Sequence, residues 1–285
     1  MMHFERFPGV FLVIASLLAS DTSRGQDRVF TYTYQSTTLG PGQRELEVWN
    51  TVRWGRVEYF RGLDQRVEFE VGLTNRLQTA FYLNIHTISQ KEISTTLEFL
   101  SPGQPVSIPK ATLLSETEFS FSNEWKFKLS DPAADPVGVA LYGEYSISSR
   151  GIELEPRLIL DKSLGGALIA FNAAGEFEFE KVVEDDGTEK TENESAMELD
   201  LGISCRILPG LYLGAEAMNV NGFGEGRWAY SALFVGPTVS YTLDNFWVNL
   251  TVLPQVTAFK GGTHDGLVLN QLERLHTRLL FSYAF

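Results

Sequence analysis

The last fifteen residues of the chain, 271–285, read QLERLHTRLLFSYAF. Alternate positions separate into a mainly apolar, aromatic set and a more polar set. The first set is Leu275, Thr277, Leu279, Phe281, Tyr283 and Phe285, and the second is Arg274, His276, Arg278, Leu280, Ser282 and Ala284. Strict alternation predicts a strand with two different faces. A chain that ended on a free aromatic strand would expose an edge prone to aggregation, whereas a closed barrel pairs its last strand with its first.

The same alternation recurs along the chain and predicts about twelve strands. They are expected at residues 44–54, 64–73, 77–86, 113–129, 137–148, 152–161, 167–180, 197–207, 211–220, 229–241, 246–255 and 271–285. Pro156 within one of them predicts a bulge or a gap in the hydrogen-bond ladder. Short turns alternate with longer connections, which is typical of an outer-membrane barrel with both termini in the periplasm. Aromatic residues near the strand ends, among them Trp54, Tyr145 and Tyr230, fit the two interface girdles of such a barrel.

The width of the barrel decides which face lines its lumen. About eight strands make a barrel that its own side chains just fill, so twelve strands leave an interior that an apolar face would not fill. Charged residues facing lipid would cost roughly 2–4 kcal/mol for each mid-plane Arg or Lys. The polar face is therefore expected inside. A soluble β-sandwich is the structural alternative, but it leaves the aromatic last strand unexplained.

This assignment predicts a set of charged, lumen-lining side chains. The set is Glu47, Arg53, Arg66, Glu68, Glu70, Glu118, Glu124, Lys126, Glu144, Glu153, Glu155, Arg157, Glu176, Glu178, Glu198, Asp200, Glu216, Arg274, His276 and Arg278. Cross-strand pairing of acids and bases would brace the wall. The same residues would also form a selectivity surface for a solute, and the two roles are compatible.

Composition excludes several classes of function. The net charge of −13 argues against nucleic acid, which selects basic surfaces. No apolar run is long enough for a membrane-spanning helix. One cysteine, Cys205, leaves neither an intramolecular disulfide nor a cysteine-based metal site. We find no cofactor fingerprint, no metal cluster and no catalytic set. His86 and His276 lie on the polar face, where we assign His276 to the lumen hydrogen-bond network, so we do not expect an enzyme.

Three regions are expected along the chain. Residues 1–25 have a basic start, a short apolar run and small residues, typical of a secretory signal peptide. Residues 26–43 contain a Gly-Pro-Gly break and are expected to be a periplasmic segment. Residues 44–285 are expected to form the barrel.

The C-terminal strand resembles the assembly signal of bacterial outer-membrane proteins, which end on Phe with aromatic or apolar residues at alternate positions. Phe281, Tyr283 and Phe285 carry this resemblance. It implies export to the outer membrane of a Gram-negative bacterium, with outer-membrane lipid and the assembly machinery as partners.

The segment SDPAADPVGVALYGEYSI, with GIELEPRLILDKSLG after it, resembles a group of uncharacterised, transporter-like outer-membrane β-barrels. That group is related to the phenol-degradation MetA-pathway proteins. The resemblance implies a barrel and the passage of small molecules, and it assigns no functional residues. We therefore expect a channel for small polar or hydrophobic solutes that prefers cations or neutral molecules. The alternative is a structural or surface-interaction barrel with a plugged lumen, for which the loop at residues 89–112 is the candidate plug.

Overall fold

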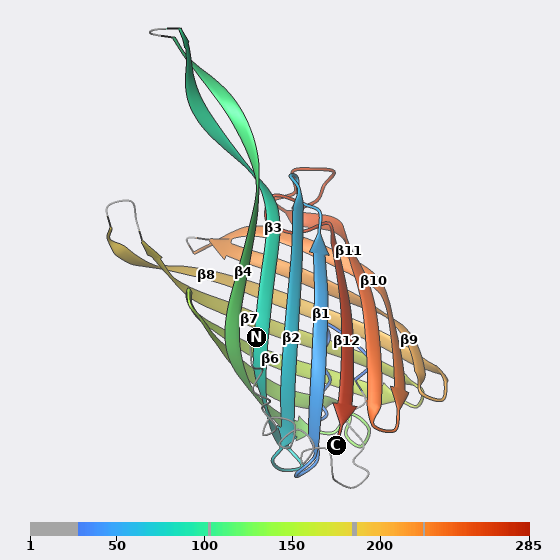
Figure 1. The fold of residues 1–285 in the computed structure, drawn as a ribbon. Helices are drawn as coiled ribbons and strands as arrows, with labels where there is room; N and C mark the ends of the chain where they lie inside the picture. Colours follow the sequence, from blue (N-terminus) through green and yellow to red (C-terminus); the bar gives the residue numbers. More distant parts are fainter. Residues whose placement is uncertain (1–27, 102–103, 184–186, 225) are drawn as a thin grey trace, which may run out of the picture.

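The computed structural model describes residues 28–101, 104–183, 187–224 and 226–285; the predicted signal peptide, residues 1–25, lies outside them. Twelve antiparallel strands close into one barrel (Figure 1). They are β1 (Arg44–Trp54), β2 (Phe60–Gly72), β3 (Leu77–Ser101), β4 (Gln104–Ser130), β5 (Gly138–Ser148), β6 (Gly151–Leu164), β7 (Ala167–Val183), β8 (Glu189–Leu208), β9 (Leu211–Gly224), β10 (Arg227–Leu243), β11 (Phe246–Lys260) and β12 (Leu275–Ala284). None of the described residues forms a helix long and apolar enough to cross a membrane.

The last strand closes the sheet, as its alternation predicted. Strand β12 pairs antiparallel with β11 on one side and with β1 on the other, where the register runs from Glu45 opposite Ala284 to Trp54 opposite Leu275. Every other strand pairs with its neighbours in sequence, so the barrel has a simple up-and-down order. The predicted all-β, twelve-stranded barrel is confirmed.

The two faces of the wall also follow the predicted alternation. On β1 the side chains of Glu45 and Glu47 are buried inside the barrel, whereas Leu46 and Trp54 are exposed outside. A bulge changes this alternation in β10, because the pairing with β9 shifts between Trp228 and Tyr230. As a result Trp228 is exposed. Tyr230, expected in an interface girdle, follows the same alternation as the buried Ala232 and Phe234 and packs against their cluster instead.

The two ends of the barrel differ. Tight turns such as residues 165–166 and 209–210 join the strands at the end where the chain terminates, which we call the short-turn end. At the opposite end several strand pairs continue beyond the barrel wall as hairpins. Strands β3 and β4 stay paired through most of residues 89–112, so this segment stands away from the barrel rather than folding into it (Figure 1).

Strand β6 contains the ladder gap that its proline predicted. Pairing between β6 and β7 runs to Leu154 opposite Phe177 and resumes at Arg157 opposite Ala174. Pro156 has no N–H to donate, so its side of the ladder is interrupted there. On the other side, the pairing of β6 with β5 continues through Pro156 opposite Gly143.

Residues 28–39 run inside the barrel without regular secondary structure. The side chains of Phe30, Tyr32 and Leu39 are buried, as are Thr31 and Thr33. This differs from the periplasmic position expected for residues 26–43. The physical reason is that the wall offers these residues both apolar contacts and hydrogen-bond acceptors. We call residues 28–39 the inner segment.

Candidate functional site: the lumen and its inner segment

Glu216 on β9 holds the middle of the inner segment. Its Oε1 accepts a hydrogen bond from Thr31 N at 2.9 Å, and its Oε2 accepts from Tyr32 N and Thr33 N at 2.8 Å each. Thr251 on β11 donates its hydroxyl to Glu216 Oε1 at 2.6 Å. One buried carboxylate thus satisfies three consecutive N–H groups that have no ladder partner of their own, which removes a large desolvation penalty.

Three further side chains from distant strands fix the rest of the inner segment. Asn172 on β7 pairs with both backbone groups of Tyr34. Asp161 on β6 accepts from Ser36 N at 3.1 Å and from the Ser36 hydroxyl at 2.5 Å. At the short-turn end, Gln78 Oε1 accepts from Leu39 N at 2.9 Å. These contacts join the segment to β3, β6 and β7, so it is anchored around much of the wall.

Apolar side chains of the inner segment pack on apolar positions of the inward face. Phe30 lies against Ala170 of β7 and against the bare Cα of Gly202, where an added Cβ would meet the Phe30 ring at 2.8 Å. Tyr34 and Tyr32, the other two aromatic residues of the inner segment, each belong to a larger buried cluster. The cluster of Tyr34 contains Trp49, Ala140, Tyr142, Ile159, Trp247 and Leu280, and that of Tyr32 contains Met218, Ala232, Phe234, Leu253 and Val268. This burial explains why a polar lumen carries so many apolar residues.

The inner segment lies between two cavities. A cavity of about 620 Å³, which we call the vestibule, faces the hairpin end, and Tyr32 and Tyr34 are part of its lining. A second cavity of about 410 Å³ lies near the short turns, and Val29, Gln35 and Thr38 help to line it. The two cavities have no lining residue in common. The segment therefore divides the lumen into two chambers.

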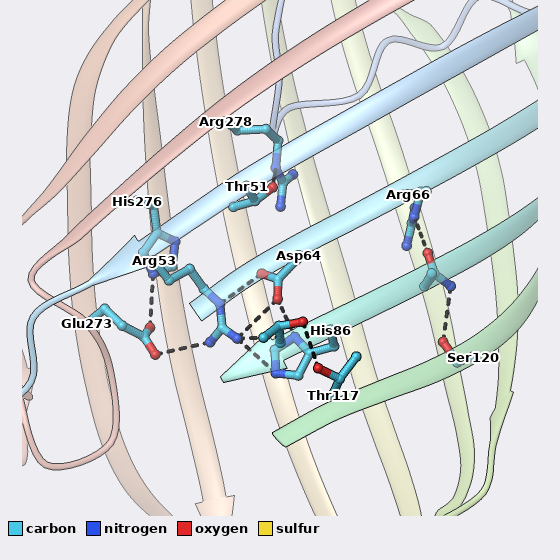
Figure 2. Close-up of polar contacts among 12 residues, drawn as sticks. Thr51, Arg53, Asp64, Arg66, His86, Thr117, Ser120, Glu273, His276 and Arg278 are labelled. Atoms are coloured by element: carbon cyan, nitrogen blue, oxygen red, sulfur yellow. Dashed lines mark hydrogen bonds and ion pairs between the residues drawn. The ribbon is translucent and has the colours of Figure 1, made fainter. Parts of the chain in front are cut away.

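One side of the vestibule is a compact network of opposite charges (Figure 2). Arg53 on β1 donates to Asp64 Oδ2 at 2.8 Å and to Glu273 Oε1 at 3.0 Å. His86 contacts Asp64, and His276 lies 3.2 Å from Glu273. Arg56 also pairs with Glu273, at 2.6 Å, so two arginines balance the two acids and this side of the vestibule carries little net charge.

The opposite side, formed by β5 to β8, is strongly acidic. Arg157 contacts Glu155, Glu198 and Asp200 at 2.9–3.4 Å. Within the described residues, no ion pair reaches Glu153, Glu176 or Glu178, although all three line the vestibule. In total ten carboxylates and five arginines line this cavity. The vestibule therefore has an acidic face opposite a balanced one.

The predicted lumen residues fall into three groups. Twelve of them line the vestibule, namely Arg53, Arg66, Glu118, Glu144, Glu153, Glu155, Arg157, Glu176, Glu178, Glu198, His276 and Arg278. Seven are buried deeper in the wall around the inner segment: Glu47, Glu68, Glu70, Glu124, Lys126, Asp200 and Glu216.

Arg274 lies elsewhere, outside the lumen. Its side chain is half exposed and pairs with Asp265 in the last loop. The reason is that β12 begins only at Leu275, so the strand alternation does not extend back to Arg274. Glu273 is the buried, inward residue instead.

The two histidines expected on the polar face, His86 and His276, both lie in the charge network. His86 contacts Asp64 and Arg53, and His276 contacts Glu273. A serine nucleophile would need a hydroxyl in hydrogen-bond contact with a ring nitrogen. Among the described residues both rings instead belong to the charge network.

Sequence reasoning missed the role of the inner segment, although the sequence contained a signal. Ala140, Ile159, Ala170, Leu253 and Leu280 occupy positions that the alternation assigns to the polar face. Apolar residues scattered on an otherwise polar inner face indicate that something apolar packs against them. The aromatic residues of VFTYTY, residues 29–34, are the side chains that pack there.

Solved outer-membrane channels and porins share the barrel fold of this chain. The chain is similar to an outer membrane channel from Pseudomonas putida F1, with a TM-score of 0.58, 9% identity, and 90% of this chain and 100% of that chain covered. It is also similar to the NanC porin (TM-score 0.51, 12% identity, 84% and 98% covered) and to the KdgM porin (TM-score 0.51, 8% identity, 85% and 99% covered). At these identities the likeness shows the fold.

The chain belongs to the family of unknown function DUF6662, whose model matches residues 22–285. No curated protein matches its sequence.

Proposed function

We propose that the protein is an outer-membrane channel in which the inner segment closes the lumen and must move before a solute can pass. The observation that carries the proposal is the position of residues 28–39 between two cavities that have no lining residue in common. A permanent structural core would be expected to fill the lumen, whereas here a cavity remains on each side of the segment. The likeness to porin barrels supports passage through the lumen rather than catalysis.

We propose that the vestibule is the entrance for solute. Its volume, about 620 Å³, is within the range of sites that take small molecules. The surplus of carboxylates on β5 to β8 favours cations and neutral polar solutes over anions, because low-dielectric walls focus the field of uncompensated charges into the cavity. In a bacterial outer membrane, the short-turn end would face the periplasm and the hairpins the outside.

A structural barrel with a permanent plug is the second candidate. It is favoured by the dense hydrogen bonding of the inner segment to Glu216, Asn172, Asp161 and Gln78. The same contacts that keep a channel closed at rest would also suit a plug that never moves. Conductance separates the two candidates.

The test is ion conduction in planar bilayers. The double variant Glu216→Ala with Asn172→Ala loosens the segment, and we expect it to conduct and to show a reversal potential of cation-preferring sign in a low-salt gradient. Adding Glu153→Gln, Glu176→Gln and Glu178→Gln should weaken that preference. Anion preference, or selectivity that these three changes leave untouched, would refute the role of the acidic face. A loosened barrel that folds but stays silent would favour the structural plug.

A further inference from the structure

Five carboxylates gather in the wall below the vestibule, where the inner segment covers them. Glu45 and Glu47 lie on β1, Glu68 and Glu70 on β2, and Glu124 on β4. The register puts Glu45 directly opposite Glu70 and Glu47 directly opposite Glu68. All five side chains are almost fully buried. Like charges in directly opposed cross-strand positions destabilise a sheet, so this cluster needs compensation.

The cations of the chain itself compensate the cluster only in part. Arg28 of the inner segment lies 3.7 Å from Glu47 and stacks over the rings of Tyr34 and Trp49. Lys126, which is also buried, lines the same small cavity as Glu70 and Glu124. Two cations next to five carboxylates leave a surplus of negative charge in a place that solvent does not reach.

Three of the five acids have a buried carboxylate oxygen without a hydrogen-bond partner among the described residues. Glu45 and Glu47 accept hydrogen bonds from the indoles of Trp247 and Trp49 at 2.6 and 2.7 Å. In contrast, the Oε2 atoms of Glu68, Glu70 and Glu124 are buried and have no hydrogen-bond partner among the residues that the structure describes. Buried polar atoms without a partner are rare in folded proteins, and each needs an explanation such as an ion.

A short side chain on the strand between them allows these acids to meet. Glu70 on β2 is opposite Ala80 on β3, and Ala80 is in turn opposite Glu124 on β4. The alanine leaves open space over β3, so the two longer side chains extend toward each other across it. One carboxylate oxygen from each of Glu68, Glu70 and Glu124 lies within 4.8 Å of the other two.

This spacing fits a calcium ion. Calcium binds oxygen at roughly 2.4 Å, so two ligands on opposite sides of the ion lie about 4.8 Å apart. An adjacent cavity of about 10 Å³, lined by Glu70 and Glu124 together with Arg28 and Lys126, has the volume of about one water-sized sphere. Carboxylate oxygens without nitrogen or sulfur select hard cations. Magnesium requires shorter bonds and keeps several waters, which this buried site has little room to hold.

We propose that Glu68, Glu70 and Glu124 bind one divalent cation, with Ca²⁺ preferred over Mg²⁺. The ion joins β2 to β4 across β3 and lies next to Arg28, the first described residue of the inner segment. This proposal is independent of whether the lumen conducts, since it concerns the charge balance of the wall. It predicts a site with a stoichiometry of one ion per barrel.

The test is calcium titration of the full-length mature barrel, refolded in detergent and stripped with EDTA. Isothermal titration should show one saturable Ca²⁺ site, with weaker binding of Mg²⁺ and a higher unfolding temperature in Ca²⁺. Glu70→Gln and Glu124→Gln should each weaken Ca²⁺ binding by at least tenfold. Ala80→Leu should do the same while keeping all three carboxylates, because its side chain fills the space between them.

The matched control carries Glu153→Gln, Glu176→Gln and Glu178→Gln, which remove acidic groups of the vestibule, and its single Ca²⁺ site should remain. Gel mobility before and after boiling checks that each variant has folded. The absence of saturable Ca²⁺ binding by the wild-type barrel would overturn the proposal and assign the compensation to protons. Loss of binding in the vestibule control, with binding retained in Glu70→Gln or Glu124→Gln, would overturn it equally.

Discussion

Asn172 binds the backbone of Tyr34 through both atoms of its side-chain amide. Its Oδ1 accepts from Tyr34 N at 2.6 Å, and its Nδ2 donates to Tyr34 O at 3.0 Å. The barrel wall thus supplies a side chain that imitates the ladder of a neighbouring strand. Since the inner segment has no regular secondary structure, its backbone groups depend on such side chains for their hydrogen bonds.

The first prediction concerns Glu216. Glu216→Ala removes the acceptor of three buried N–H groups, each costing roughly 1–3 kcal/mol when left unpaired. We expect amide hydrogen exchange at residues 31–33 to accelerate by at least tenfold while the strands of the barrel stay protected. Glu178→Ala is the control, because Glu178 is an exposed acid of the vestibule. Unchanged exchange in Glu216→Ala would mean that the carboxylate does not hold the segment.

The second prediction concerns Gly202, on which Phe30 packs. In Gly202→Leu the new side chain occupies the place of the Phe30 ring, since even a Cβ would lie 2.8 Å from it. We expect the inner segment to become accessible to protease in the folded barrel. Gly143→Ala is the matched control, because nothing lies within 4 Å of its added Cβ. Equal cleavage of both variants would contradict this packing.

The third prediction concerns acid. Burial raises the pKa of Glu273, but the hydrogen bond with His276 and the charges of Arg53 and Arg56 outweigh it and lower the pKa to about 2. A group whose folded pKa is depressed stabilises the fold above its usual pKa of 4.5 and loses that contribution as the pH falls toward 2. The protection of last-loop amides, measured relative to their intrinsic exchange rate at each pH, should therefore fall below about pH 4. Glu273→Gln should remove most of this pH dependence, and a wild-type profile in that variant would refute the assignment.

Most of the fold could be predicted because it depends on a period of two. The alternation along residues 64–73 and 271–285 determined which side chains face outward, and the even strand number followed from turn chemistry. Strand ends were less predictable, since β3, β4, β7 and β8 continue as hairpins through polar sequence. Backbone pairing continues through these extensions without an apolar alternation that would show in the sequence.

The inner segment could not be located because no local pattern reports it. Phe30, Tyr32 and Tyr34 alternate like a short strand, yet their partners come from many different strands. The contacts of Glu216 and Asn172 with this segment span more than a hundred residues of sequence. These residues come into contact only in the closed barrel, where inward side chains of many strands surround the segment.

The fourth prediction concerns assembly. Phe281 and Tyr283 are exposed on the outer face, whereas Phe285 is buried against Phe69 and Tyr283. Tyr283→Ser with Phe285 deleted should reduce insertion into the outer membrane severalfold while export continues. Cell fractionation should then find the protein in the periplasm or degraded. Normal outer-membrane amounts of the double variant would show that the aromatic end is dispensable for assembly.

The central claim is that residues 28–39 close a conducting lumen. The most direct measurement is single-channel conductance of the wild-type barrel and of a variant that lacks residues 28–39, with both shown to be folded by heat-dependent gel mobility. We predict that the wild-type barrel is closed for most of the recording and that the variant conducts steadily, with at least a severalfold larger mean current. Equal conductance of the two proteins, or silence of a correctly folded variant, would contradict the claim.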